Sequence, residues 1–270
     1  MNRLAEQFEQ LRTKNEGALV AYLMAGDPDP LRSLEYAMAM EAGGADVIEL
    51  GLPFSDPIAD GPTIQAAGVR AFQSKITMKS FVQIITEFRA LSKTPLVVMS
   101  YYNPIWKMGE ETFLKQIVEA GADGVAIPDL PVEESTNWLN QCRKYHTSRI
   151  FFVTPETDDG RAKKIAEQST GFLYLVPRYG TTGARDELAS HTASLIQRVR
   201  PLMPAGLPLA VGFGLSNKEQ VQTVITAGAD AAIVGSALVD KIAQGVSPET
   251  LMLFVRELKD GTRRSASAAV

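Results

Sequence analysis

The stretch that decides the fold spans residues 42–63 and reads AGGADVIELGLPFSDPIADGPT. It begins with a glycine-rich helix end, continues as a short apolar strand at 46–50, and then enters a loop rich in proline and carboxylates. The same helix-to-strand joint recurs as AGADGVAI at 120–127 and as AGADAAIV at 227–234. Three copies of one joint indicate a single repeated architecture.

Apolar runs alternate with helical patterns along the whole chain. The expected strands lie at 18–24, 46–50, 95–100, 124–127, 149–153, 172–176, 208–211 and 231–234. They are apolar on both faces, as parallel strands covered by helices should be. Eight strand–helix units predict an α/β fold, a (β/α)₈ TIM barrel with an extra N-terminal helix at 2–14. A doubly wound sheet is the alternative, but the glycine-rich dinucleotide turn is missing after the first strand.

The domain organisation follows from this count. We expect one barrel domain over residues 1–262 and a disordered tail of small polar residues at 263–270. Between the strands we expect one helical stretch over 63–89 and another helix over 132–145.

Composition excludes several classes of protein. The 270 residues carry a net charge of -4 without long charged runs, which argues against a nucleic-acid surface. No apolar run approaches the length of a membrane span, the N-terminus does not resemble a secretory signal, and the single cysteine, Cys142, suits a reducing cytoplasm. The two histidines, His146 and His191, have no neighbours at metal-ligand spacing, so we expect both at the surface and no metal site. Carboxylates are therefore the candidates for proton transfer.

Two carboxylates of the opening stretch lie where a barrel builds its active site. Glu49 ends an apolar strand, where a carboxylate is costly to bury without a partner or a function, and Asp60 follows in the next loop. The alternative for Asp60 is a cap on the helix that begins near Pro62. Asp56 suits a loop or interface position. Asp129, after the fourth strand, suits either the barrel mouth or a helix N-terminus.

The late loops predict a phosphate site. Glycines at 180–183, 212–214 and 235 each precede a helix, where backbone N–H groups and the helix dipole favour an anion. Aromatic residues also fall near strand ends and suggest a slot for a flat ring: Tyr22, Tyr101, Tyr102, Phe152, Tyr174 and Phe213. Together these features predict acid–base chemistry on a phosphorylated metabolite.

The sequence resembles the tryptophan synthase alpha subunit family over nearly its whole length. The most specific motif is PFSDPIADGPTIQ at 53–65, and others follow in the family's order at 22–28, 101–105, 129–134, 211–214 and 234–237. The resemblance implies cleavage of indole-3-glycerol phosphate to indole and glyceraldehyde 3-phosphate, a lyase reaction without metal or organic cofactor. It also implies a beta-subunit partner in an alpha2beta2 complex.

The resemblance assigns roles residue by residue. Glu49 is expected to transfer the protons and Asp60 to accept the indole N–H. Pro53 and Asp56 are expected at the partner interface. The residues expected to bind substrate are Tyr22, Tyr102, Tyr174, Thr182, Gly183, Phe213, Gly214, Gly235 and Ser236.

The sequence departs from the family in the loop after the sixth strand, where Pro177, Tyr179 and Thr181 are unusual. That departure leaves open how the loop closes and how it responds to a partner. Three alternatives also remain open: a stand-alone lyase that releases indole, a non-catalytic activator of a beta subunit, and a sugar-phosphate epimerase or isomerase. The last would be expected to show metal ligands or a lysine at a strand end, and neither is evident.

Overall fold

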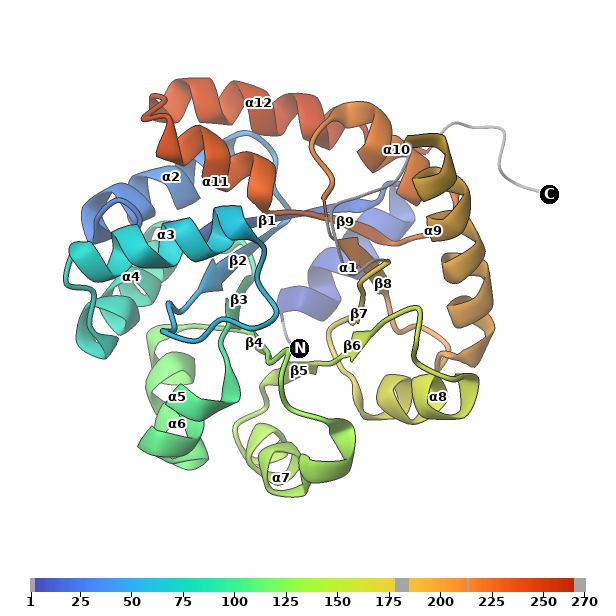
Figure 1. Ribbon diagram of the computed structural model, residues 1–270, viewed down its shortest axis with the longest axis horizontal. Helices are drawn as coiled ribbons and strands as arrows, with labels where there is room; N and C mark the ends of the chain where they lie inside the picture. Colours follow the sequence, from blue (N-terminus) through green and yellow to red (C-terminus); the bar gives the residue numbers. More distant parts are fainter. Residues whose placement is uncertain (1–2, 178–184, 213, 265–270) are drawn as a thin grey trace.

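The computed structural model describes residues 3–177, 185–212 and 214–264. In this part of the chain the strands form one parallel sheet surrounded by helices, in the order β5-β4-β3-β2-β1-β9-β8-β7-β6 (Figure 1). The strands are β1 (Ala18–Met24), β2 (Val47–Gly51), β3 (Leu96–Met99), β4 (Gly124–Ala126), β5 (Ser148–Ile150), β6 (Phe152–Val153), β7 (Leu173–Leu175), β8 (Leu209–Gly212) and β9 (Ala231–Val234).

The two edges of this sheet belong to one stretch of chain. β5 pairs with β4, β6 pairs with β7, and only Phe151 separates β5 from β6. They therefore act as the two halves of one barrel strand, and the sheet closes on itself. The predicted (β/α)₈ barrel is confirmed.

Helices cover the outside of the barrel (Figure 1). They are α1 (Arg3–Thr13), α2 (Pro30–Ala42), α3 (Pro62–Gln73), α4 (Met78–Leu91), α5 (Tyr102–Met108), α6 (Glu110–Ala120), α7 (Thr136–Lys144), α8 (Asp159–Gln168), α9 (Arg185–Val199), α10 (Lys218–Thr226), α11 (Ser236–Ala243) and α12 (Pro248–Asp260). Short 3₁₀ turns lie at Val132–Glu134 and Arg200–Leu202.

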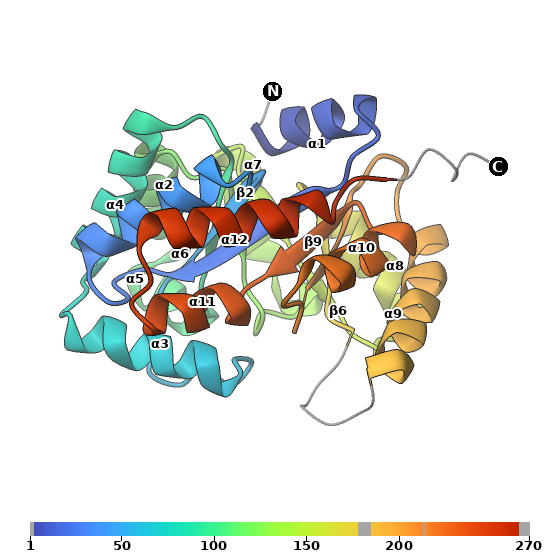
Figure 2. The same ribbon diagram turned by 90° about the horizontal axis from the view of Figure 1, so that it is seen from above.

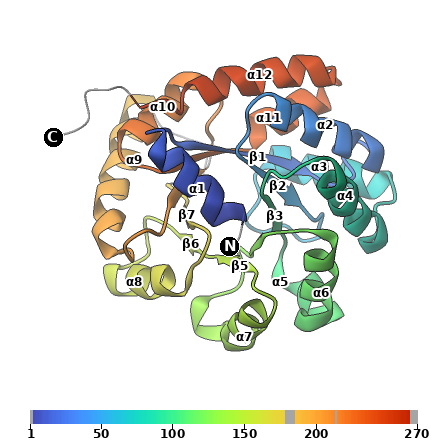
Figure 3. The same ribbon diagram turned by 180° about the vertical axis from the view of Figure 1, so that it is seen from behind.

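The extra N-terminal helix closes one end of the barrel. Leu4, Phe8 and Leu11 of α1 are buried against the interior side chains of the strands, among them Val20 and Phe172. Figure 2 shows α1 at one end of the barrel, and Figure 3 shows it crossing the strands from behind. The N-terminal ends of the strands are thus covered, and the C-terminal ends remain for a site.

The recurring joint has a structural explanation. Its aspartate in each copy accepts a hydrogen bond from the first free N–H of the adjacent strand: Asp46 from Leu19 at 2.7 Å, Asp123 from Leu96 at 2.9 Å, and Asp230 from Leu209 at 2.8 Å. Each carboxylate is also paired with a basic side chain, namely Lys259, Arg89 or Arg200. The repeat therefore satisfies strand-end donors and their buried acceptors together.

Local boundaries differ from prediction where capping signals interrupt a helix. The expected helical stretch over 63–89 is two helices, because Lys75 adopts a positive φ of 61° and Thr77 forms a capping box with Ser80 at the start of α4. The expected helix over 132–145 begins with a 3₁₀ turn. At the C-terminus, the backbone of Arg263 forms an isolated antiparallel bridge with that of Glu16, and the Arg264 side chain donates to the carbonyl of Ala229, so these two residues belong to the ordered barrel.

Candidate active site

Glu49 lies inside the barrel near the C-terminal end of β2. Its neighbour Ile48 packs outward into the main core, whereas Val47 and Glu49 point inward because side chains alternate along a strand. Glu49 is 1% exposed, and neither carboxylate oxygen has a hydrogen-bond partner among the described residues. Burial, together with the charge of Asp60, raises the pKa of Glu49 to about 8. At neutral pH the group therefore holds a proton.

Asp60 lies in the loop between β2 and α3, half-buried. The Ala59 N–H donates to the Tyr101 hydroxyl at 2.9 Å, and the Tyr101 ring packs on Phe54 with centroids 5.3 Å apart. Burial raises the pKa of Asp60 to about 6, although a hydrogen bond with Tyr101 opposes the shift. Asp60 does not take the alternative capping role: the N-cap of α3 is Gly61, and no side chain accepts a hydrogen bond from the helix N–H groups at that position.

The two carboxyl groups therefore lose their protons at different pH values. Between pH 6 and 8 the stable combination is a neutral Glu49 beside an ionised Asp60. Such a pair offers one proton donor and one negative charge close enough to interact with each other. This is the arrangement that acid–base chemistry with a developing positive charge requires.

Tyr22 and Tyr174 share the interior with these carboxyl groups. Both are nearly fully buried, and burial followed by the charges of Asp60 and Glu49 raises their pKa values. Glycines make room for them. A Cβ on Gly51 would overlap the Tyr22 hydroxyl and lie 2.8 Å from its Cζ, and one on Gly212 would lie 2.9 Å from the Tyr174 hydroxyl. Phe152 stacks on Tyr174 at 4.6 Å.

The predicted phosphate positions lie where β8 and β9 end. Gly214 has a φ of +78°, a left-handed conformation that side chains rarely adopt. Gly235 joins β9 to the first turn of α11, which begins at Ser236. Among the described residues, a Cβ on Gly235 would make ordinary contacts with Tyr22, the nearest at 3.6 Å, so Gly235 packs beside Tyr22 without strain. Thr182, Gly183 and Phe213 lie outside the described residues, as do Tyr179 and Thr181.

Tyr102 is not the tyrosine that faces the two carboxyl groups. Its hydroxyl donates to Glu110 of α6 at 2.9 Å, and its backbone N–H donates to Asp129 at 2.8 Å. Asp129 thus accepts a hydrogen bond at the start of α5, a different helix from the one expected after Pro131, and its place at the barrel mouth stays a prediction. Tyr101, the preceding residue, contacts the Asp60 loop. Consecutive residues at this strand-to-helix turn point in different directions, and the substrate-binding role of Tyr102 stays a prediction.

The predicted interface residues differ in exposure. Pro53 is buried, whereas Asp56 is exposed and accepts a hydrogen bond from Ser55. In the same loop Ile58 is 84% exposed, and on the neighbouring α5 Trp106 is 68% exposed. His146 and His191 are at the surface, as expected.

The described ranges contain no group of three or more side chains placed to hold a metal ion. None of the helices described is long and apolar enough to cross a membrane.

The fold and site define a class: (β/α)₈ barrels with two interacting carboxyl groups of raised pKa at the C-terminal ends of the strands. Comparison with known proteins specifies it further. The sequence profile of the family described as "Tryptophan synthase alpha chain" matches residues 8–266. A tryptophan synthase alpha chain from Methanosarcina barkeri is 46% identical over 265 residues, which cover 98% of each chain.

Solved structures of tryptophan synthases support the same family assignment. A chain of tryptophan synthase from Mycobacterium tuberculosis superimposes with a TM-score of 0.89 at 32% identity, covering 98% of this chain and 99% of that one. A chain of a tryptophan synthase complex from Pyrococcus furiosus gives 0.82 at 37% identity, covering 90% and 98%. The chain belongs to the tryptophan synthase alpha chain family, so the predicted lyase class and the role in tryptophan biosynthesis are confirmed. The comparisons do not favour the stand-alone and non-catalytic alternatives.

Proposed function

We propose that Glu49 and Asp60 carry out the cleavage of indole-3-glycerol phosphate in this chain. The observation that supports this most directly is the pair itself: a buried Glu49 with a pKa of about 8 and no hydrogen-bond partner among the described residues, near an Asp60 with a pKa of about 6. A carboxyl group held neutral by burial is a proton donor at neutral pH.

The reaction then proceeds in two proton transfers. Glu49 gives its proton to the ring carbon that bears the glycerol chain, and the ring nitrogen becomes positive. Asp60 accepts the ring N–H and stabilises that charge. The Glu49 carboxylate next takes the proton of the adjacent glycerol hydroxyl, and the carbon–carbon bond breaks. Its electrons return to the ring, releasing indole and glyceraldehyde 3-phosphate, while Glu49 is again protonated.

The remaining residues bind the two ends of the substrate. Tyr22, Tyr174 and Phe213 would line the ring and glycerol site, with Tyr101 holding the Asp60 loop in place. The phosphate would bind at Thr182, Gly183, Gly214, Gly235 and Ser236, where backbone N–H groups precede helices. The position of Gly235 directly before the first turn of α11 supports this assignment.

A beta subunit would bind at the loop that contains Pro53 and Asp56. The exposed side chains of Ile58 and Trp106 beside that loop support such an interface, because large apolar groups are costly to leave in water. The single buried thiol of Cys142 suits the cytoplasm.

Indole release from indole-3-glycerol phosphate, measured with and without a beta subunit, tests the proposal. We expect activity in the isolated chain and stimulation by the partner. An Ile58→Asp variant should keep the basal rate and lose stimulation. Absence of indole release under both conditions would overturn the assigned chemistry, and undiminished stimulation of the variant would overturn the assigned interface.

A further inference from the structure

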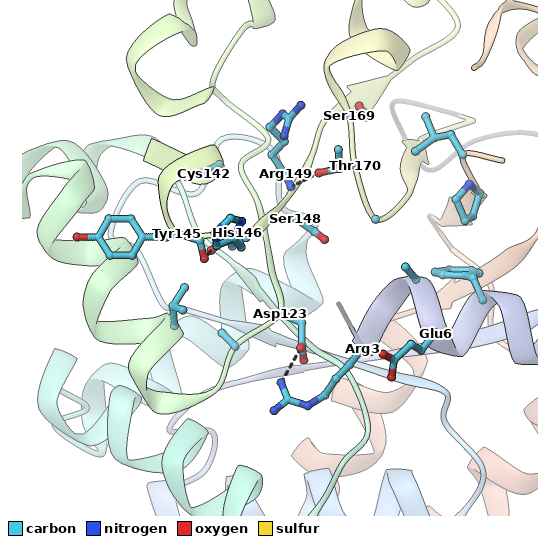
Figure 4. Close-up of a pocket in the computed structure, with 18 of the residues that line it drawn as sticks. Arg3, Glu6, Asp123, Cys142, Tyr145, His146, Ser148, Arg149, Ser169 and Thr170 are labelled. Atoms are coloured by element: carbon cyan, nitrogen blue, oxygen red, sulfur yellow. Dashed lines mark hydrogen bonds and ion pairs between the residues drawn. The ribbon is translucent and has the colours of Figure 1, made fainter. Parts of the chain in front are cut away.

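A large cavity lies at the end of the barrel opposite the active site, beside α1. Its volume is about 1340 Å³, and it is lined by α1, by the end of α7 and by the chain around β5. Four arginines contribute to its wall: Arg3, Arg12, Arg143 and Arg149. Figure 4 shows Arg149 beside Thr170 and Ser169, away from the Arg3–Asp123 pair.

Two of these arginines are neutralised by carboxylates. Arg3 forms an ion pair with Asp123 at 2.7 Å, and Arg12 forms one with Glu9 at 3.0 Å. Glu6, drawn near Arg3 in Figure 4, is exposed on α1. The other two arginines have no carboxylate within ion-pair distance in the part of the chain that the structure describes.

Arg143 has an ordinary explanation, but Arg149 does not. Arg143 is in the last turn of α7, where a cation complements the helix dipole, and it donates to Asn140. Arg149 is on β5, on the outward side that packs under a helix. Its register partner on β4 is the fully buried Val125. A guanidinium therefore occupies a position where the barrel ordinarily places an apolar side chain.

The surroundings of Arg149 leave its charge uncompensated. Its Nε is buried and has no hydrogen-bond partner among the described residues. Burial lowers the pKa of Arg149, and the neighbouring Arg143 acts in the same direction. The buried Nε is out of reach of a ligand, but no described residue accepts a hydrogen bond from the terminal nitrogens of this half-buried guanidinium, so they can donate to an acceptor in the cavity.

A hydroxyl group completes the donor set. Thr170 Oγ1 accepts the Arg149 backbone N–H at 3.1 Å, which leaves the Thr170 hydroxyl proton available to a ligand. Arginine forks and hydroxyl groups together match a tetrahedral oxyanion. We propose that this cavity binds a phosphate group through Arg149, Arg143 and Thr170, either as the free ion or as part of a phosphorylated metabolite.

The guanidinium itself provides the readout. In the full-length protein labelled with ¹⁵N-arginine, the Arg149 Nε–Hε resonance is assigned from its loss in Arg149→Lys. Titration with inorganic phosphate, and separately with ribose 5-phosphate, should shift this resonance in a saturable manner, while that of the paired Arg12 stays unchanged. Tighter binding of ribose 5-phosphate identifies a metabolite site, and equal or tighter binding of inorganic phosphate identifies a free-ion site.

A stability measurement separates this site from the active site, which also binds phosphate under the proposed function. Arg149→Met should unfold at no lower temperature than the native chain in phosphate-free buffer, because it removes an unpaired cation. Phosphate should raise the unfolding temperature of the native chain more than that of Arg149→Met, with about tenfold weaker binding in the variant. Equal increases, or an Arg149 resonance that does not respond to either ligand, would overturn the proposal.

Discussion

Arg70 binds Asp27 through two parallel hydrogen bonds, from Nε to Oδ1 and from Nη2 to Oδ2, each 2.7 Å long. Asp27 is 1% exposed and follows β1, whereas Arg70 is on α3. Ser74, near the end of α3, also donates to the carbonyl of Gly26. Since α3 begins at Pro62, two residues after Asp60, these contacts anchor the helix that follows the Asp60 loop.

Replacing Arg70 by Met should reduce the free energy of unfolding by about 3–5 kcal/mol, because it leaves a buried carboxylate without its partner. Denaturant unfolding checks this value. Arg12→Met is the matched control: the Arg12–Glu9 pair is exposed and should contribute less than about 1 kcal/mol. Adding Asp27→Asn to Arg70→Met should restore part of the loss. A single variant as stable as the native chain would show that the pair does not anchor α3.

Glu49→Gln should reduce the rate of indole release by about 10²–10⁴, since the amide has no proton to transfer. Substrate affinity should stay within a few-fold, because size and shape are nearly unchanged. Steady-state kinetics at saturating substrate provide the measurement. If the variant kept more than about a tenth of the native rate, Glu49 would not be the proton donor.

The same variant should change how stability depends on pH. In the native chain the pKa of Glu49 rises from its ordinary value of 4.5 to about 8 on folding. Stability is therefore lost as pH increases through this interval, because the unfolded state gives up its proton first. The Glu49→Gln variant does not lose stability in this way. The free energy of unfolding of the variant relative to that of the native chain should therefore increase from pH 4.5 to pH 8, by at most about 5 kcal/mol. Parallel unfolding curves for the two proteins would contradict a buried, neutral Glu49.

For Asp60→Asn we expect a severe loss of activity together with a shifted pH profile. In the native chain kcat/KM should rise as Asp60 ionises near pH 6 and fall as Glu49 ionises near pH 8. The amide carries no charge to raise the pKa of Glu49, so the alkaline limb should move to lower pH. The residual activity of the variant, followed from pH 5 to 10, tests this. An unmoved alkaline limb would mean that the two groups do not interact.

Alanine substitutions at Gly235 and Gly51 should affect different properties of the protein, ligand binding at the first and stability at the second. Gly235→Ala should leave stability unchanged, because the added Cβ meets only ordinary contacts, but it should weaken binding of glyceraldehyde 3-phosphate and spare free indole. Gly51→Ala should lower the unfolding temperature, since its Cβ would overlap Tyr22. Calorimetric titrations and thermal unfolding distinguish the two effects. If Gly235→Ala weakened the binding of indole and of glyceraldehyde 3-phosphate equally, the loop at Gly235 would instead belong to the site of the indole ring.

The sequence by itself determined the barrel and the positions of its reactive carboxylates. Hydrophobic runs and joint glycines are local signals, and Asp46, Asp123 and Asp230 recur because every repeat presents the same strand-end donor. The motif around Glu49 and Asp60 was specific enough to identify the family from the chain alone. Helix boundaries were less well predicted, since short capping contacts such as that of Thr77 decide them.

Only the tertiary structure decided how these groups behave. Tyr101 and Tyr102 are adjacent in sequence, and no local pattern shows which one meets the Asp60 loop. The pKa of Glu49 depends on burial by the closed barrel and on a charge from another loop. The partner of Arg70, and the absence of an acceptor for Arg149 Nε among the residues that the structure describes, are likewise set by segments distant along the chain. Burial and charge are properties of surroundings in space, and packing alone brings those surroundings together.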